Sequence, residues 1–148
     1  EPNHLCSIDK DVVGGAADLG EDPDTIIRPT IDSVDDRLDI FWFQGTDNFN
    51  SLCAVRDRSR EKIRIDLTGI PAGIELRMRV FREQGSCEAG FGEFADGVGT
   101  CDGHPCFRYE EDCGADDDGN YIIHIERLNE GFSCGETYTL QVRGLINL

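Results

Sequence analysis

Apolar and polar residues alternate with a period of two along much of the chain. The alternation is regular at residues 62–67, 74–81, 121–126 and 138–143, and a short aromatic segment, LDIFWF, stands at 38–43. A period of two places successive side chains on opposite faces of a β-strand, so that one face is buried and the other meets water. No segment has a convincing apolar period of 3.6 residues. Several such strands separated by turns predict an all-β fold, an antiparallel, jelly-roll-like β-sandwich.

Four segments fall outside the regular alternation. Residues 1–25 are polar, acidic and rich in glycine, which predicts an irregular N-terminal arm. Residues 26–31 fit a short first strand, and Pro29 predicts that this strand lies at a sheet edge. The sequence TGIPAG at 68–73 predicts a tight, hairpin-like connection. Residues 83–113 are rich in cysteine and predict a long loop region stapled by disulfides, within a single domain that spans 1–148.

The charge of the chain restricts its partners. The sequence has 30 acidic and 14 basic residues and a formal net charge of −16. Such a field disfavours nucleic acid and anionic membranes and favours cations, and it also keeps a surface soluble by repulsion. No stretch approaches the 18 apolar residues of a membrane span, so we expect no membrane insertion.

Seven cysteines are scattered along the chain. The closest two, Cys101 and Cys106, have four residues between them, and no C-x-x-C pair occurs. A zinc cluster normally shows two close pairs, whereas scattered cysteines in a chain rich in turns are typical of disulfides. Disulfides imply an oxidising compartment, so we predict a secreted, extracellular or cell-surface location.

The odd number of cysteines allows at most three bridges within the chain. Cys113 and Cys134 flank the predicted strand at 121–125, and a bridge between them would close a loop of about 20 residues. A bridge from Cys6 to Cys53 would pin the arm. For the last bridge the candidates are Cys87, Cys101 and Cys106, and one of these three is left over. That thiol is free, joined to another chain, or paired with a residue beyond this sequence.

The motifs of known catalytic sites are absent from the sequence. Its three histidines, His4, His104 and His124, lie far apart, and no esterase, zinc-protease, phosphate-loop or dinucleotide motif occurs. His124 stands in an alternating segment and is expected to face solvent or a polar rim, whereas His104 is expected in a loop flanked by cysteines. With 30 acidic residues, chance carboxylate pairs do not indicate a glycosidase. We predict that the chain is not an enzyme.

Two acidic segments are candidates for binding calcium, which takes six to eight oxygen ligands from loops. The segment DDDGN at 116–120 fits a plain turn better than a metal loop. The segment DSVDDRLD at 32–39 runs directly into the aromatic strand. Its adjacent carboxylates would repel one another without a cation, so this segment is the stronger candidate.

Four short motifs follow one another along the chain. EPN opens it and AADLG stands at 16–20; TIDS at 30–33 precedes DIFWF at 39–43; IDLTGIPAGIELRM occupies 65–78; and ETYTLQV occupies 136–142. The ordered set resembles the motifs of the bacterial pre-peptidase C-terminal domain family, whose members are small jelly-roll-like sandwiches appended to secreted peptidases. The resemblance spans essentially the whole chain.

The resemblance implies a non-catalytic accessory module of a larger secreted or cell-surface bacterial protein. Its partners would be the rest of its own polypeptide and an extracellular protein, such as collagen, or a polysaccharide. It further implies calcium held by Glu1, Asn3 and Asp39, with Asp36 as a further ligand, although the chain departs from the family's D-x-D spacing at this point. The alternative function is a structural domain of an extracellular or envelope assembly with an interchain disulfide.

Overall fold

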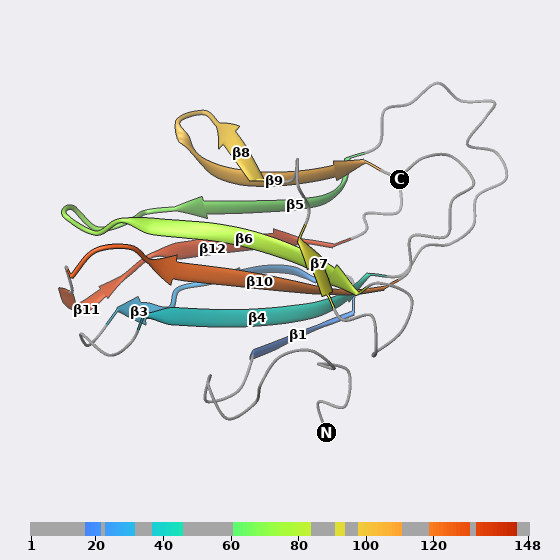
Figure 1. Ribbon diagram of the computed structural model, residues 1–148, viewed down its shortest axis with the longest axis horizontal. Coiled ribbons are helices and arrows are strands. Elements are labelled where there is room, and N and C mark those ends of the chain that lie inside the picture. Colours follow the sequence, from blue (N-terminus) through green and yellow to red (C-terminus); the bar gives the residue numbers. More distant parts are fainter. Residues whose placement is uncertain are drawn as a thin grey trace, which may run out of the picture.

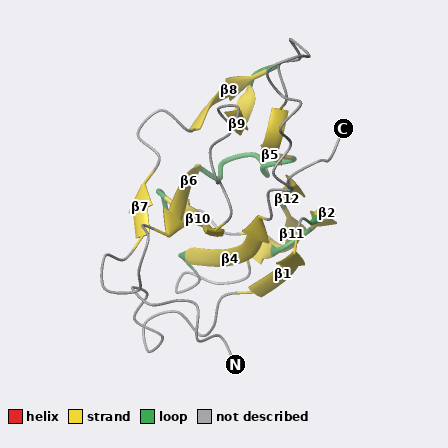
Figure 2. Cartoon of the chain, turned by 90° about the vertical axis from the view of Figure 1, so that its right-hand side faces the viewer, coloured by secondary structure: helices red, strands yellow, loops and turns green. Residues whose placement is uncertain are grey.

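A computed structural model describes residues 17–21, 23–31, 37–45, 61–83, 91–93, 98–110, 119–130 and 133–144. This part of the chain forms twelve strands and no helix (Figures 1 and 2). The strands are β1 (Ala17–Glu21), β2 (Asp24–Ile27), β3 (Thr30–Ile31), β4 (Leu38–Gly45), β5 (Glu61–Thr68), β6 (Leu76–Glu83), β7 (Phe91–Glu93), β8 (Val98–Cys101), β9 (His104–Glu110), β10 (Gly119–Arg127), β11 (Ser133–Thr137) and β12 (Thr139–Arg143). The described residues contain no helix that is long and apolar enough to cross a membrane.

Two five-stranded sheets make up the fold. Sheet A has the spatial order β1-β4-β10-β6-β7, and sheet B has the order β2-β12-β5-β9-β8. A short pair, β11 and β3, lies beside them. Neighbouring strands are antiparallel except for β1 and β4, which are parallel. The predicted all-β sandwich is confirmed.

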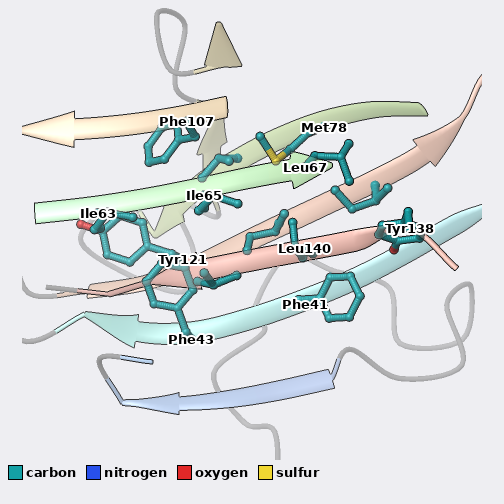
Figure 3. Close-up of a cluster of buried hydrophobic side chains, with 14 of the residues drawn as sticks. Phe41, Phe43, Ile63, Ile65, Leu67, Met78, Phe107, Tyr121, Tyr138 and Leu140 are labelled. Atoms are coloured by element: carbon teal, nitrogen blue, oxygen red, sulfur yellow. The ribbon is translucent and has the colours of Figure 1, made fainter. Parts of the chain in front are cut away.

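The core lies between the two sheets, and the inward side chains are those that the alternation predicts. Phe43 and Tyr121 stack in it with their ring centroids 5.1 Å apart (Figure 3). The buried cluster comprises Phe41, Phe43, Ile63, Ile65, Leu67, Ile74, Met78, Val80, Phe107, Tyr121, Ile123, Ile125, Tyr138, Leu140 and Val142. Burial of apolar surface contributes roughly 25 cal/mol per Å², so this cluster supplies the main driving force for folding.

The connection at 68–73 differs from the predicted hairpin. Strand β5 belongs to sheet B and β6 to sheet A, so the segment crosses from one sheet to the other. The backbone NH of Ile74 donates to the carbonyl of Pro71 (3.1 Å), and Gly73 has φ +80°, as a type II turn requires. Ile74 is buried in the core. The prediction of a hairpin at 68–73 was wrong because alternation specifies which face of each strand is buried but not which strands pair.

Strands also occupy parts of the predicted arm and loop. β1 and the start of β2 lie within 1–25, and β7, β8 and β9 lie within 83–113. The predicted first strand at 26–31 is broken at Pro29, because β2 joins the edge of sheet B whereas β3 pairs with β11. The carbonyl of Pro29 accepts a hydrogen bond from the backbone NH of Tyr138 (3.2 Å). A proline has no NH to donate to a ladder, which explains the break.

Candidate functional site

One of the four predicted calcium ligands lies in the described part of the chain. Asp39 belongs to β4, and the Tyr138 hydroxyl donates a hydrogen bond of 2.5 Å to its Oδ2. Asp39, Tyr138 and Arg127 line the same small cavity of about 10 Å³. Among the described residues no group of three or more His, Cys, Asp or Glu side chains is placed to hold a metal. The other candidate ligands, Glu1, Asn3 and Asp36, lie outside the described residues, so the calcium site stays a prediction.

The cysteines of the β8–β9 hairpin form a disulfide. Cys101 and Cys106 are bridged, with their Cα atoms 5.7 Å apart. Asp102 and Gly103 form the turn with φ +49° and +85°, the left-handed values that a tight two-residue hairpin requires. This bridge resolves one of the pairings that the sequence left open. Cys134 lies in β11, while Cys6, Cys53, Cys87 and Cys113 lie outside the described residues, so their pairings stay predictions.

A buried carboxylate lies beside this hairpin. Asp66 is only 6% exposed, although it stands at one of the polar positions that alternate with the core residues of β5. Arg64 donates from Nε to Oδ2 (2.6 Å) and from Nη2 to Oδ1 (3.3 Å), and His104 Nε2 lies 3.0 Å from Oδ1. Burial raises the pKa of Asp66, but the hydrogen bonds and charges of Arg64 and His104 outweigh burial and lower the pKa below its usual value. Asp66 thereby ties β9 to β5.

A cleft of about 360 Å³ opens on sheet A, at the end where β4 begins and β10 ends. It is lined by Arg37, Leu38, Arg79, His124, Glu126, Arg127 and Leu128. The lining therefore holds three arginines, a histidine and one carboxylate, and Glu130 pairs with Arg37 at the rim. Leu128 is 52% exposed and forms an apolar part of the lining. Pockets for small ligands usually measure about 300–1,000 Å³, so this cleft can take a small group.

Hydrogen bonds from several segments fix the rim of the cleft. The carbonyl of Arg37 accepts from the backbone NH of Arg127 (2.9 Å), and the guanidinium of Arg37 binds both carboxylate oxygens of Glu130 (2.7 and 2.8 Å). The backbone NH of Leu128 donates to the carbonyl of Glu75 (2.9 Å). A rim held from both sides presents its side chains in a fixed geometry, which lowers the entropic cost of binding.

Aromatic contacts position Arg79 and His124 on the floor of the cleft. Arg79 and His124 are cross-strand neighbours on β6 and β10. The guanidinium of Arg79 lies 5.0 Å from the centroid of the Phe81 ring, and the imidazole of His124 lies 4.7 Å from it. Phe81 in turn packs against an apolar cluster of Ile40, Trp42 and Ile122 on the outer face of sheet A.

The cationic lining contrasts with the charge of the chain. The described part holds ten of the fourteen basic residues but only fourteen of the thirty acidic ones. Its formal charge is therefore −4, and the remainder of the chain carries −12. The arginines are concentrated on the strands, and the acidic residues are concentrated outside the described part.

Part of this site could have been found in the sequence. Arg79 alternates with apolar residues along its segment of the sequence, and the same alternation predicts that His124 faces solvent or a polar rim. Arg127 follows the core-facing residues of β10 at the same spacing of two, and it is 4% exposed. A charged residue at the end of an alternating apolar series can therefore indicate a buried charge. The proximity of Arg37 and Leu128 depends on tertiary structure, and no local pattern indicated it.

Comparison of the chain with family models, curated proteins and solved structures gives no match. The resemblance to the pre-peptidase C-terminal domain family therefore stays a prediction, and the cleft has to be interpreted from its own chemistry.

Proposed function

We propose that this domain is a non-catalytic accessory module that binds a ligand for a larger secreted or cell-surface bacterial protein, and that the cleft on sheet A is its ligand site. The observation that carries the proposal is a fixed cleft lined by Arg37, Arg79, Arg127 and His124 in a chain of net charge −16. A soluble surface does not need cationic residues to converge in this way. The partner would be an extracellular protein or polysaccharide that bears an anionic group.

The lining residues support a particular chemistry for that group. Arginine forks match the geometry of a carboxylate, and Leu38 and Leu128 offer apolar surface beside them. Glu126 also lines the cleft, and its carboxylate pairs with Arg77, just as Glu130 pairs with Arg37 at the rim. A ligand with a carboxylate next to an apolar or ring carbon skeleton fits both features. An acidic sugar and an acidic amino acid both have this character.

The intrinsic fluorescence of the protein provides the test. Trp42 is the only tryptophan, and Ile122 lies between it and Phe81 in the register of sheet A. Because Phe81 contacts both Arg79 and His124, a ligand in the cleft should perturb the indole emission. Titration with glucuronate and with N-acetylglutamate should give a saturable change, whereas glucose and N-acetylglutamine should give none.

Two variants of equal charge complete this experiment. Arg79→Gln should weaken binding by roughly tenfold to a hundredfold, because a hydrogen bond to a charged group contributes about 1.5–3 kcal/mol. Arg28→Gln removes the same charge from an exposed residue that does not line the cleft, and it should leave the affinity unchanged. Equal losses in the two variants, or no saturable change with either carboxylate, would refute the cleft as ligand site.

Calcium binding is proposed separately, on the resemblance and on the acidic segment at 32–39. Saturating calcium should raise the free energy of unfolding by about 2.7 kcal/mol at one hundred times the dissociation constant. Thermal melting in calcium and in chelator measures this difference. Equal melting temperatures, together with no heat of calcium binding, would contradict a calcium-stabilised arm and would leave the cleft proposal intact.

A further inference from the structure

Strand β8 is an accessible edge of sheet B (Figure 2). Its only neighbour among the described strands of this sheet is β9, and Val98, Gly99 and Thr100 are all exposed. Val98 is one of the few exposed large apolar residues of the described part, at 38%. A Cβ atom added at Gly99 would have no atom within 4 Å beyond its chain neighbours. The outer edge of β8 is therefore open to a further strand.

The backbone of β8 presents hydrogen-bonding groups along this edge. In a two-residue hairpin the residues that flank the turn form a hydrogen-bonded pair, and here these residues are Cys101 and His104. Hydrogen-bonded and non-hydrogen-bonded pairs alternate along an antiparallel ladder, so Thr100 and Val98 stand at non-hydrogen-bonded positions. The NH and C=O groups at such positions point away from the neighbouring strand. Val98 and Thr100 thus offer two NH and two C=O groups to an additional strand.

Pro105 is consistent with this pattern of hydrogen bonds. It is the partner of Thr100 in the ladder between β8 and β9. Because proline has no NH, a non-hydrogen-bonded position is the one at which β9 loses no bond to β8. The disulfide between Cys101 and Cys106 also ties the two strands of the hairpin together. The edge is therefore held in an extended form before any partner binds, which lowers the entropic cost of binding.

The other edges of the two five-stranded sheets carry charged residues or prolines, which oppose pairing with another chain. β1 contains Asp18 and Glu21, and β7 has only three residues and ends on Glu93. β2 begins with Asp24, and it has one proline just before it and another two residues after it. β8 has the sequence VGTC, with neither a charge nor a proline. Of these four edges, β8 is the one best suited to strand addition.

The charge of the chain favours a basic partner strand. Residues 88–102 contain four acidic residues and no lysine or arginine, and Asp102 is exposed at the turn of the hairpin. The whole chain carries a formal charge of −16. Ion pairs within the chain leave this total unchanged, so a second copy of the chain or an acidic strand is repelled. A strand that carries lysine or arginine is attracted.

We propose that β8 pairs with an extended basic segment of a partner protein, which adds to sheet B as a further strand. Backbone hydrogen bonds to Val98 and Thr100 would hold the segment, and the exposed side chain of Val98 would contact one of its apolar residues. In strand addition, main-chain bonds supply affinity and alternate side chains supply specificity. No residue of β8 lines the cleft on sheet A, so this inference does not rest on the function proposed for the cleft.

The test is the binding of fluorescently labelled heptapeptides to the folded domain, measured by anisotropy at about 0.15 M salt, where distant charges are screened. Lysine and valine alternate in the first peptide, which should bind, and glutamate replaces lysine in the second, which should not. Thr100→Pro removes one outward NH without a change of charge, and an edge position tolerates proline. It should weaken binding of the lysine peptide roughly threefold to tenfold, the effect of one lost backbone hydrogen bond. Thr100→Val keeps the NH and should leave the affinity unchanged.

A second measurement uses the wild-type domain alone. The lysine peptide methylated on all of its backbone nitrogens keeps its charge but cannot donate to β8, so it should lose binding. Circular dichroism and melting show that both Thr100 variants are folded.

Four results would overturn the proposal. Equal affinities of Thr100→Pro and Thr100→Val, or undiminished binding of the methylated peptide, would show attraction by charge alone. Absence of binding at millimolar lysine peptide would exclude strand addition by a basic segment. Equal binding of the glutamate peptide would exclude a preference for basic partners. Dimers of the domain in sedimentation that Thr100→Pro abolishes and Thr100→Val retains would assign the edge to a second copy of the chain.

Discussion

The substitution Asp66→Asn tests the packing of sheet B around a buried charge. It keeps the size of the side chain and removes its negative charge. Asp66 is 6% exposed and receives charge-assisted contacts from Arg64 (2.6 Å) and His104 (3.0 Å). Hydrogen bonds to charged groups contribute about 1.5–3 kcal/mol each, and asparagine retains one acceptor. We therefore expect the variant to lose about 2 kcal/mol of unfolding free energy at pH 7.

This loss should depend on pH in a defined direction. The pKa of Asp66 is lowered in the folded state, so its contribution is fully present above the unfolded pKa of about 3.9 and is lost as the pH falls through the folded pKa. A protonated aspartic acid is neutral, like asparagine. The difference between wild type and variant should therefore be present at pH 5 and above and shrink below about pH 4.

Urea unfolding at pH 7, 5, 4 and 3 measures this difference. Asp24→Asn is the control, since its carboxylate is 84% exposed and lies 3.9 Å from Arg143, and exposed pairs of this kind contribute little. A difference for Asp66→Asn that stays the same from pH 7 to pH 3 would refute the role assigned to its charge. A difference below about 0.5 kcal/mol at pH 7 would refute the buried network itself.

Three further predictions concern the stability of the domain and are measured by urea unfolding at pH 7. Replacing both Cys101 and Cys106 by serine should cost about 2 kcal/mol in the chain-entropy model, and an unchanged midpoint would contradict the bridge. Tyr138→Phe removes the hydrogen bond to the half-buried Asp39 carboxylate and should cost about 1–2 kcal/mol; a neutral result would show that this bond contributes nothing. Ile123→Ala should cost about 2–5 kcal/mol because its side chain is fully buried, whereas Ile26→Ala, which is 50% exposed, should cost far less.

The alternation of apolar residues predicted most of the core. Ile63, Ile65 and Leu67 are fully buried, as their phase in the sequence indicates. Alternation did not indicate that β5 and β6 lie in different sheets, because the same pattern fits a hairpin and a crossing between sheets. The pairing of strands is decided by contacts between residues far apart in the sequence, and a single chain carries no local signal for them.

The outer face of sheet B shows the same limit. Arg64, Arg108 and Arg143 look like ordinary wet-face residues on three separate segments, and only the register of β12, β5 and β9 aligns them. Asp66 stands in a polar phase, yet it is buried because His104, 38 residues away in sequence, reaches it. The net charge shows that the chain is acidic overall, but it does not indicate where the basic residues lie in the structure.

The ligand site of this module is tested most directly by amide NMR during titration with glucuronate and with N-acetylglutamate. The shifts of backbone amides identify the residues that a ligand contacts, whatever its affinity up to the millimolar range. If the cleft on sheet A binds carboxylates, the largest shifts will map to Arg79, His124 and Leu128, and they will saturate. Shifts that scatter over both sheets, or their absence at millimolar concentrations of both ligands, would contradict the proposed function.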